Sequence, residues 1–312
     1  MQTRLVRLTA MALLASCCLA RSAAAQERGP REEAKTEKTI PVQGIEEVKA
    51  SVMIGPIKVV ADSPNTIQVR AVRHAEGGTA DDRRRWLSET KVEIEKQGAA
   101  LIVKDVVPKS LRQNGHAKNL SMGLDLELHV PSRLAMTLAA GVGDVEATGV
   151  AGGLTVATGA GNVRLRQLGG PEEGVTVDVG AGNVTMDGQA GDVRIHSGAG
   201  KVSLQNLDCA GKTLFVDTGA GDVSAALRSL PSGNLRINVG TGRIRLSVPD
   251  KARADISAAS GMGSIRSAFA LAGQKQSGGG FGGTLSGNLN GGGAEVSLHT
   301  GIGEIQLERQ NQ

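Results

Sequence analysis

Apolar and polar residues alternate along most of the second half of the chain, and glycine pairs interrupt the alternation at regular intervals. The motif Gly-x-Gly, followed by a polar residue and then Val or Ile, occurs eight times. The first glycines of the copies are Gly141, Gly159, Gly180, Gly198, Gly219, Gly240, Gly261 and Gly301. Apolar residues recur three and five positions before this glycine, and four and six positions after it. Period-2 alternation is typical of β-strands, so each copy predicts a strand on either side of a glycine corner.

The copies also predict how these strands associate. Glycine tolerates a sharp bend and a close approach of two backbones because it has no side chain. Equivalent apolar columns stack best when equivalent strands lie parallel, about 4.8 Å apart. The sequence therefore predicts an all-β fold, a parallel β-solenoid with coils of about 20 residues. A meander of antiparallel hairpins with turns at the glycines is the alternative that the pattern leaves open.

The regions outside the repeats differ in composition. The predicted segments are a signal peptide (1–25), a flexible tether (26–38), a β-rich N-terminal cap (39–135), the solenoid repeats (136–308) with a glycine-rich excursion (277–293), and a polar tail (309–312). Thr79-Ala80-Asp81-Asp82 predicts the start of one short helix in the cap, which carries Trp86 and Leu87. A cap is expected because the open end of a solenoid must be covered.

The N-terminal segment predicts export. Two arginines precede a short apolar stretch, and Ala23-Ala24-Ala25 is a small-residue cleavage site. We therefore expect a periplasmic, cell-surface or secreted protein with no transmembrane span, because the apolar stretch is too short to cross a bilayer. Leu14-Ala15-Ser16-Cys17 is also similar to a bacterial lipobox, in which Cys17 becomes lipidated. Soluble export and a lipid anchor through Cys17 both remain open.

Composition narrows the function classes. The chain has 44 glycines among 312 residues, and only 1% of its residues are aromatic. The chain has 35 basic and 31 acidic residues, and three of the basic residues lie in the predicted leader. The exported chain is therefore nearly neutral, and no nucleic-acid partner is predicted. Cys209 is the one cysteine outside the leader, which excludes an internal disulfide. We predict that it is a small buried hydrophobic residue and not a reactive thiol.

The repeat sequences resemble a known family. The copies include T-G-A-G-N-V, V-G-A-G-N-V, S-G-A-G-K-V and T-G-A-G-D-V, preceded by Val130-Pro131-Ser132 and followed by Gly291-Gly292-Gly293. This series resembles the bacterial "putative adhesin" β-strand-repeat family, a β-solenoid domain of unknown function. The resemblance spans residues 39–307. It implies the solenoid fold and supplies no catalytic residues.

One outward column contains groups that are capable of chemistry. Asp178, His196, Asp217 and Asn238 each stand two residues before the first glycine of their copy. In a parallel stack they become neighbours about 4.8 Å apart. Carboxylates that flank an imidazole are a pattern for metal binding or acid–base chemistry. Alanines occupy the same column toward both ends, and we predict a polar surface ladder with no catalytic, cofactor-binding or metal-binding role.

Two further motifs are rejected. Gly211-Lys212-Thr213 resembles the end of a phosphate-binding loop, but Asn206 stands where that loop needs its first glycine. The position after the second glycine is acidic in several copies, as in calcium-binding solenoids, but Lys201 and Arg243 would place cations among the ligands. No cofactor is predicted.

These observations favour an exported, non-enzymatic structural or adhesin-like module. It would present a rigid β-face to a protein or polysaccharide of the envelope or the extracellular space. Two alternatives remain: a carbohydrate-active β-helix enzyme, such as a polysaccharide lyase or hydrolase, and a periplasmic envelope-sensing partner. Turnover of polysaccharides would distinguish the enzyme from the other two.

Overall fold

The computed structural model describes residues 30–108, 111, 119–209, 211, 213–278 and 281–310. The predicted signal peptide, Cys17 and residues 26–29 of the predicted tether lie outside these ranges. Within them, no helix has the length and apolar character needed to cross a membrane.

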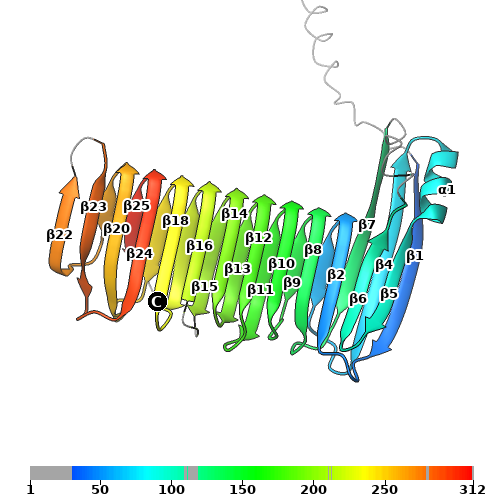
Figure 1. Cartoon of the computed structure of the whole chain (residues 1–312), viewed down its shortest axis with the longest axis horizontal. Helices are drawn as coiled ribbons and strands as arrows, with labels where there is room; N and C mark the ends of the chain where they lie inside the picture. The colour runs from blue at the N-terminus through cyan, green and yellow to red at the C-terminus, as the bar shows by residue number, and fades with distance from the viewer. Residues whose placement is uncertain are drawn as a thin grey trace, which may run out of the picture.

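Two long β-sheets lie face to face and enclose a continuous apolar core (Figure 1). Sheet A contains, in spatial order, β1 (Arg31–Pro41), β4 (Thr66–Gly77), β7 (Leu120–His129), β3 (Ile57–Val60), β9 (Val145–Thr148), β11 (Val163–Gly170), β13 (Val184–Ala190), β15 (Val202–Cys209), β17 (Val223–Ser229), β19 (Ile244–Val248), β25 (Ile305–Arg309) and β21 (Ile265–Ser267). Sheet B contains, in spatial order, β22 (Ala272–Gly278), β23 (Gly283–Leu289), β20 (Ala254–Met262), β24 (Ala294–Ile302), β18 (Asn234–Thr241), β16 (Thr213–Ala220), β14 (Val193–Ala199), β12 (Val175–Ala181), β10 (Leu154–Ala160), β8 (Ala135–Val142), β2 (Glu47–Ile54), β6 (Ala100–Val106) and β5 (Lys91–Gln97).

The middle of the stack is a parallel β-solenoid. Each coil is a strand of sheet B, a glycine corner and a strand of sheet A. Equivalent residues lie opposite one another, so that Val156 pairs with Leu138 on one side and with Val177 on the other. The columns predicted to face inward are buried, apart from Ser267 near the last corner. Parallel pairing confirms the predicted solenoid and excludes a hairpin meander in these coils.

The two glycines of each corner are required for different reasons. The second glycine has a positive φ, 153° at Gly161 and 138° at Gly200, a backbone conformation that other residues rarely adopt. The first glycine lies against the preceding coil, and a Cβ on Gly159 would stand 2.6 Å from the carbonyl oxygen of Gly141. Any side chain at either position therefore forces neighbouring coils apart.

The solenoid begins earlier than the sequence repeats indicate. Strands β2 and β3 pair in parallel with β8 and β9, and Gly55 forms the corner between them. Met53 occupies the position of the first glycine in this coil. Residues 47–60 thus belong to the stack, although they were assigned to the cap.

The predicted tether is wrong where the structure describes it, because residues 31–38 form most of strand β1. This strand pairs with β4 in antiparallel register, and Glu37 lies opposite Arg70. In turn, Arg70 lies opposite Glu127 on β7. Cross-strand pairs between opposite charges stabilise a strand with few apolar residues.

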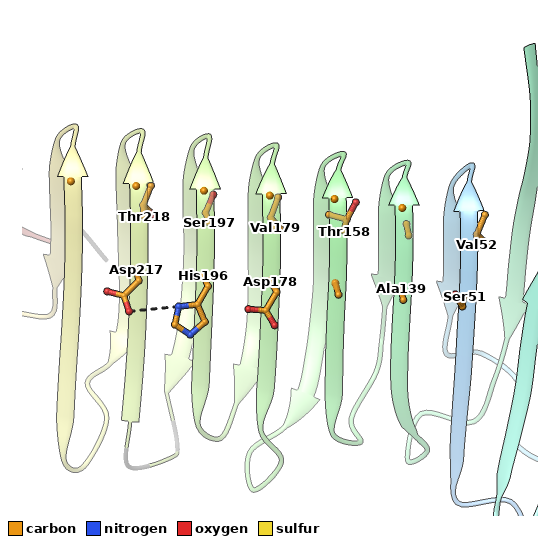
Figure 2. Close-up of a pocket in the computed structure, with 18 of the residues that line it drawn as sticks. Ser51, Val52, Ala139, Thr158, Asp178, Val179, His196, Ser197, Asp217 and Thr218 are labelled. Atoms are coloured by element: carbon orange, nitrogen blue, oxygen red, sulfur yellow. Dashed lines mark ion pairs between the residues drawn. The ribbon is translucent and has the colours of Figure 1, made fainter. Parts of the chain in front are cut away.

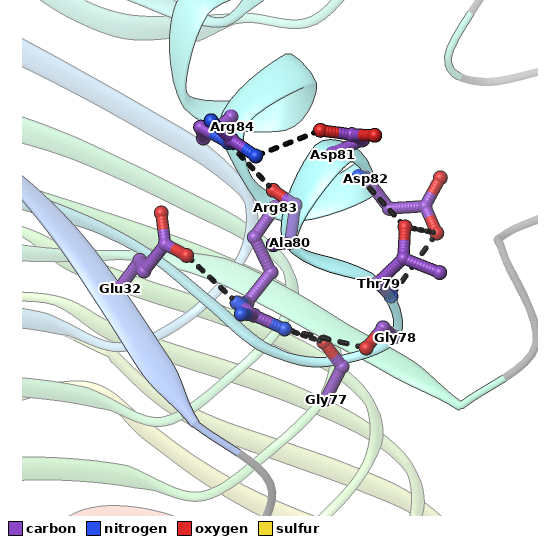
Figure 3. Close-up of polar contacts among 9 residues, drawn as sticks. All are labelled: Glu32, Gly77, Gly78, Thr79, Ala80, Asp81, Asp82, Arg83 and Arg84. Atoms are coloured by element: carbon purple, nitrogen blue, oxygen red, sulfur yellow. Dashed lines mark hydrogen bonds and ion pairs between the residues drawn. The ribbon is translucent and has the colours of Figure 1, made fainter.

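Helix α1 (Ala80–Glu89) begins where the sequence predicts (Figure 3). Thr79 is its N-cap, and the hydroxyl of Thr79 and the carboxylate of Asp82 form a capping box. The Arg83 side chain is only 7% exposed and pairs with Glu32 of β1 at 3.0 Å. It also donates to the carbonyl oxygens of Gly77 and Gly78. Arg83 therefore connects the helix to the outermost strand of the N-terminal cap.

The C-terminal end departs from the order of the sequence. Strand β24 inserts between β18 and β20, as the red strand between yellow and orange in Figure 1 shows. Much of the predicted glycine-rich excursion is regular structure, because β23 pairs antiparallel with β20 and β22 pairs with β23. These two strands cover the end of sheet B. Antiparallel strands therefore end both sheets on the N-terminal side and sheet B on the C-terminal side, where sheet A ends on the parallel strand β21.

Candidate functional site

A groove of about 1220 Å³ runs over the outer face of sheet B, across the strands from β2 to β24 (Figure 2). Seven of its lining residues are the first glycines of their coils, namely Gly141, Gly159, Gly180, Gly198, Gly219, Gly240 and Gly301. Because glycine has no side chain, this row of glycines forms a depression that runs along the stack. The groove reaches Met53, Asp105 and Val107 at its N-terminal end, where Met53 replaces the glycine.

The predicted polar ladder lies along this groove. Asp178, His196, Asp217 and Asn238 stand directly opposite one another on four neighbouring strands, and Figure 2 shows the first three on one face. Nδ1 of His196 is 3.6 Å from a carboxylate oxygen of Asp217. The Asn238 amide donates to the other oxygen of Asp217 at 2.6 Å.

His299 also belongs to this row, and the sequence analysis did not include it. It lies opposite Asn238 because β24 inserts beside β18. The signal was present in the sequence, since His299 stands two residues before Gly301, in the column that holds the other four.

The row offers hydrogen-bonding groups at the surface of the groove. Within the described ranges, no three His, Cys, Asp or Glu residues are grouped closely enough to hold a metal ion. The Thr158 hydroxyl donates to the carbonyl of Gly143, and no hydroxyl that lines the described groove is hydrogen-bonded to His196 or His299. The carboxylates of Asp105, Asp178 and Asp217 and the two imidazoles are the ionisable groups of the lining.

A second polar row lies at the position after the second glycine of the corner, where several copies carry an acidic or amide residue. The Asp144 carboxylate accepts from the backbone amide of Asn162, and the Asn162 side chain accepts from that of Asn183. Burial raises the pKa of Asp144, but hydrogen bonds from Asn162 and Arg164 outweigh this effect and hold the pKa below its ordinary value of 3.8. These side chains join neighbouring coils, a role that the sequence pattern alone did not indicate.

The two remaining sequence candidates are structural. Cys209 is buried, and burial raises the pKa of its thiol to about 12, which confirms the prediction of a small buried residue. The segment that resembles a phosphate loop leads into strand β16 at Thr213 and not into a helix. Neither supplies a site.

The sequence matches a known protein family and is similar to several solved structures. Residues 88–308 match the profile of a family described as Toastrack DUF4097. No functionally curated protein matches the chain. Among solved structures, a putative adhesin from Bacteroides fragilis is similar at 13% identity and a TM-score of 0.40, over 88% of this chain and 97% of that one.

Two structures from Parabacteroides distasonis are also similar. One, a putative adhesin, is 14% identical with a TM-score of 0.38, over 88% of this chain and 97% of that one. The other, a putative lipid binding protein, is 11% identical with a TM-score of 0.39, over 89% of this chain and 97% of that one. Similarity at these identities and TM-scores does not indicate what this chain binds.

Proposed function

The chain belongs to the Toastrack DUF4097 family, and we propose that it is an exported, non-enzymatic binding protein. In this proposal, the groove of sheet B holds an extended polymer of the cell envelope or the extracellular space. Export rests on the sequence of residues 1–25, with its basic start, short apolar stretch and small-residue cleavage site.

The observation that carries the proposal is the direction of the groove. It crosses the strands of sheet B, so it follows the long axis of the stack. Along this axis the lining repeats once per coil, about every 4.8 Å. A compact ligand would occupy a small part of such a surface, whereas an extended polymer can make similar contacts at successive coils.

Two features favour binding without turnover. The groove floor is a continuous parallel sheet that is hydrogen-bonded on both sides, so it presents a surface formed before the ligand arrives. Nucleophilic catalysis requires a hydroxyl or thiol within hydrogen-bonding distance of a base. The described part of the groove places its histidines beside carboxylate and amide groups instead.

A groove-filling substitution tests the proposal. Ala157 lines the groove and points outward from β10, so Ala157→Trp should place a large ring in the path of the polymer. Thr185→Trp on β13 is the matched control, because it adds the same ring to the outer face of sheet A. Both proteins and the wild type are titrated with a panel of envelope and extracellular polysaccharides and proteins, and product release is followed in parallel.

We expect one class of polymer to bind the wild type and the Thr185→Trp variant, to bind the Ala157→Trp variant weakly, and to remain uncleaved. Release of shortened product would overturn the non-enzymatic part of the proposal. Binding that is equal in all three proteins would exclude the groove as the site. Failure of every polymer to bind would overturn the proposal as a whole.

A further inference from the structure

A second row of side chains lies beside the groove on the same face. Arg194, Phe215 and Arg236 stand directly opposite one another on β14, β16 and β18. Each precedes a member of the polar ladder by two residues, and residues two apart on a strand share a face at roughly 7 Å. The three side chains therefore border the groove at its most polar stretch, next to His196, Asp217 and Asn238.

Arg194 and Arg236 are unpaired in the part of the chain that the structure describes. Within the residues that the structure describes, neither Arg194 nor Arg236 forms an ion pair or a side-chain hydrogen bond, and both are exposed. Three arginines on the outer face of sheet A, namely Arg164, Arg245 and Arg266, each pair with a glutamate. Unpaired guanidinium groups two strands apart, roughly 10 Å, can each bind an anionic group of a ligand.

Among the described residues, the neighbouring carboxylate of Asp217 forms no ion pair with either arginine. Asn238 donates to one of its oxygens, and His196 faces the other at 3.6 Å. Both contacts lie within the ladder, and neither reaches the arginine row. The positive charge of Arg194 and Arg236 thus faces solvent.

Phe215 stands between the two arginines and is half-buried on the outer face of β16. The other aromatic residues lie elsewhere, since Trp86 and Phe269 are buried and Phe281 precedes β23 at the end of the stack. An aromatic ring on an open sheet face offers a flat apolar surface beside polar groups. Sugar rings have C–H faces that pack on such a surface.

We propose that Arg194, Phe215 and Arg236 bind an acidic polysaccharide that lies along the groove of sheet B. Carboxylate groups of the polymer accept hydrogen bonds from the two guanidinium groups, which match them in a bidentate geometry. A sugar ring between these acidic groups packs on Phe215. This inference rests on the proposed function and names the class of polymer that the groove takes.

The adjacent ladder favours a polysaccharide over a nucleic acid. Hydroxyl groups of a sugar can donate hydrogen bonds to Asp178 and Asp217, which accept when ionised. The sugars of DNA carry no free hydroxyl along the chain, so DNA would bring its phosphates against these carboxylates without sugar hydroxyls to donate to them. A polymer that carries both acidic groups and free hydroxyls fits both rows.

Calorimetric titration of the purified full-length protein tests the inference, with polygalacturonate as the acidic probe, dextran as the neutral probe and single-stranded DNA as the third arm. The test variants are the double substitution Arg194→Ala/Arg236→Ala and the single substitution Phe215→Ala. The matched control is Arg166→Ala/Arg228→Ala, which removes two exposed arginines from sheet A. Circular dichroism verifies that each variant is folded.

We expect polygalacturonate to bind the wild type and the control equally, with an affinity that falls as salt is added. The Arg194→Ala/Arg236→Ala variant should bind at least about tenfold more weakly, because charge-assisted hydrogen bonds are lost. Phe215→Ala should also weaken binding, whereas Phe215→Trp, which keeps an aromatic ring, should bind as the wild type does. Dextran should bind weakly to all variants.

Several outcomes would overturn the inference. One is equal loss in the test and control variants, and another is preferential binding of single-stranded DNA. A third outcome is that Ala157→Trp abolishes binding of dextran or polygalacturonate, while the Arg194→Ala/Arg236→Ala variant binds it as the wild type does. That result would reject the arginine row and retain the proposed groove. Absence of binding to polygalacturonate would overturn this inference, whereas the proposed groove falls only if the full panel of polysaccharides and proteins also fails to bind.

Discussion

Asn238 on β18 lies opposite His299 on β24, although a complete coil, the one that contains Gly261, separates them in the chain. The final coil enters between two coils that are already adjacent in sequence. It forms parallel pairs on both sides, with β18 and with β20. The strand nearest to the C-terminus in sheet B is therefore an internal strand of the stack.

Hydrogen exchange should reveal this order. We expect the amides of β24 to exchange as slowly as those of β18, because both strands are bonded on two sides and contribute buried residues such as Leu298 and Ile237. Strand β22 is the internal control, since it lies at the edge of sheet B and is exposed throughout. Mass-spectrometric exchange that is equally fast in β24 and β22 would contradict the inserted order.

The corner glycines should tolerate no substitution. In Gly200→Ala the new Cβ would overlap the carbonyl oxygen of Gly182, at a positive φ that alanine disfavours. We expect a loss of about 3 kcal/mol or more in the free energy of unfolding. Gly169→Ala is the control, because its Cβ would meet only the Ala151 side chain at 3.7 Å. Urea titrations compare the variants, and similar losses would refute the steric argument.

The inward columns were predictable because one physical requirement sets them. Alternate residues of a strand face the same side, and the thin core between the two sheets is filled mainly by apolar side chains. Val184 is fully buried on β13, and the next residue, Thr185, points outward. The period alone therefore assigned both residues to the correct side.

A pair of substitutions measures this alternation. Val184→Asp places an unpaired carboxylate among apolar neighbours and should cost more than about 4 kcal/mol of stability, or prevent folding. Thr185→Asp, one residue along, should change stability by less than about 1 kcal/mol because its side chain faces solvent. Thermal denaturation gives both values. Comparable losses would contradict the assigned faces.

Features that depend on long-range pairing were not predictable. The copies that contain Gly261 and Gly301 have the same apolar columns, so no local signal orders them in the stack. The first coil was missed because Met53 replaces the glycine that defines a copy. Strand β1 was read as a tether because its stability comes from charges on β4 and β7, which sequence alone does not bring together. The row with Phe215 was missed because only one outward column was compared.

Opposite charges alternate across the N-terminal strands of sheet A. The row, read in register, is Glu37, Arg70, Glu127, Lys58, Glu146 and Arg164. Lys58 donates to Glu127 at 2.8 Å, and this hydrogen bond lowers the pKa of the Glu127 carboxyl below 4.5. The resulting stability is present above the ordinary glutamate pKa and is lost as pH falls through the lowered value.

The variant Lys58→Met tests this linkage. It removes the ammonium group and keeps most of the length of the side chain. At neutral pH the variant should be slightly less stable than the wild type, because a solvent-exposed ion pair contributes little. The difference should vanish as pH falls below the lowered pKa of Glu127, because the carboxyl is then protonated and no longer pairs with Lys58. Denaturant titrations across this range measure it, and a difference that is independent of pH would exclude the ion pair as its source.

The ladder of Asp178, His196 and Asp217 should not bind a metal ion with defined stoichiometry. Asn238 already occupies one oxygen of Asp217, and a zinc site needs three or four ligands around one point. Successive strands instead place these side chains in a line. Titration of the chelator-treated protein with Zn²⁺ at neutral and acidic pH should show only weak binding that His196→Ala leaves unchanged. Tight binding that disappears in His196→Ala, and that weakens in acid because protons compete with the metal for the imidazole, would make the ladder a metal site.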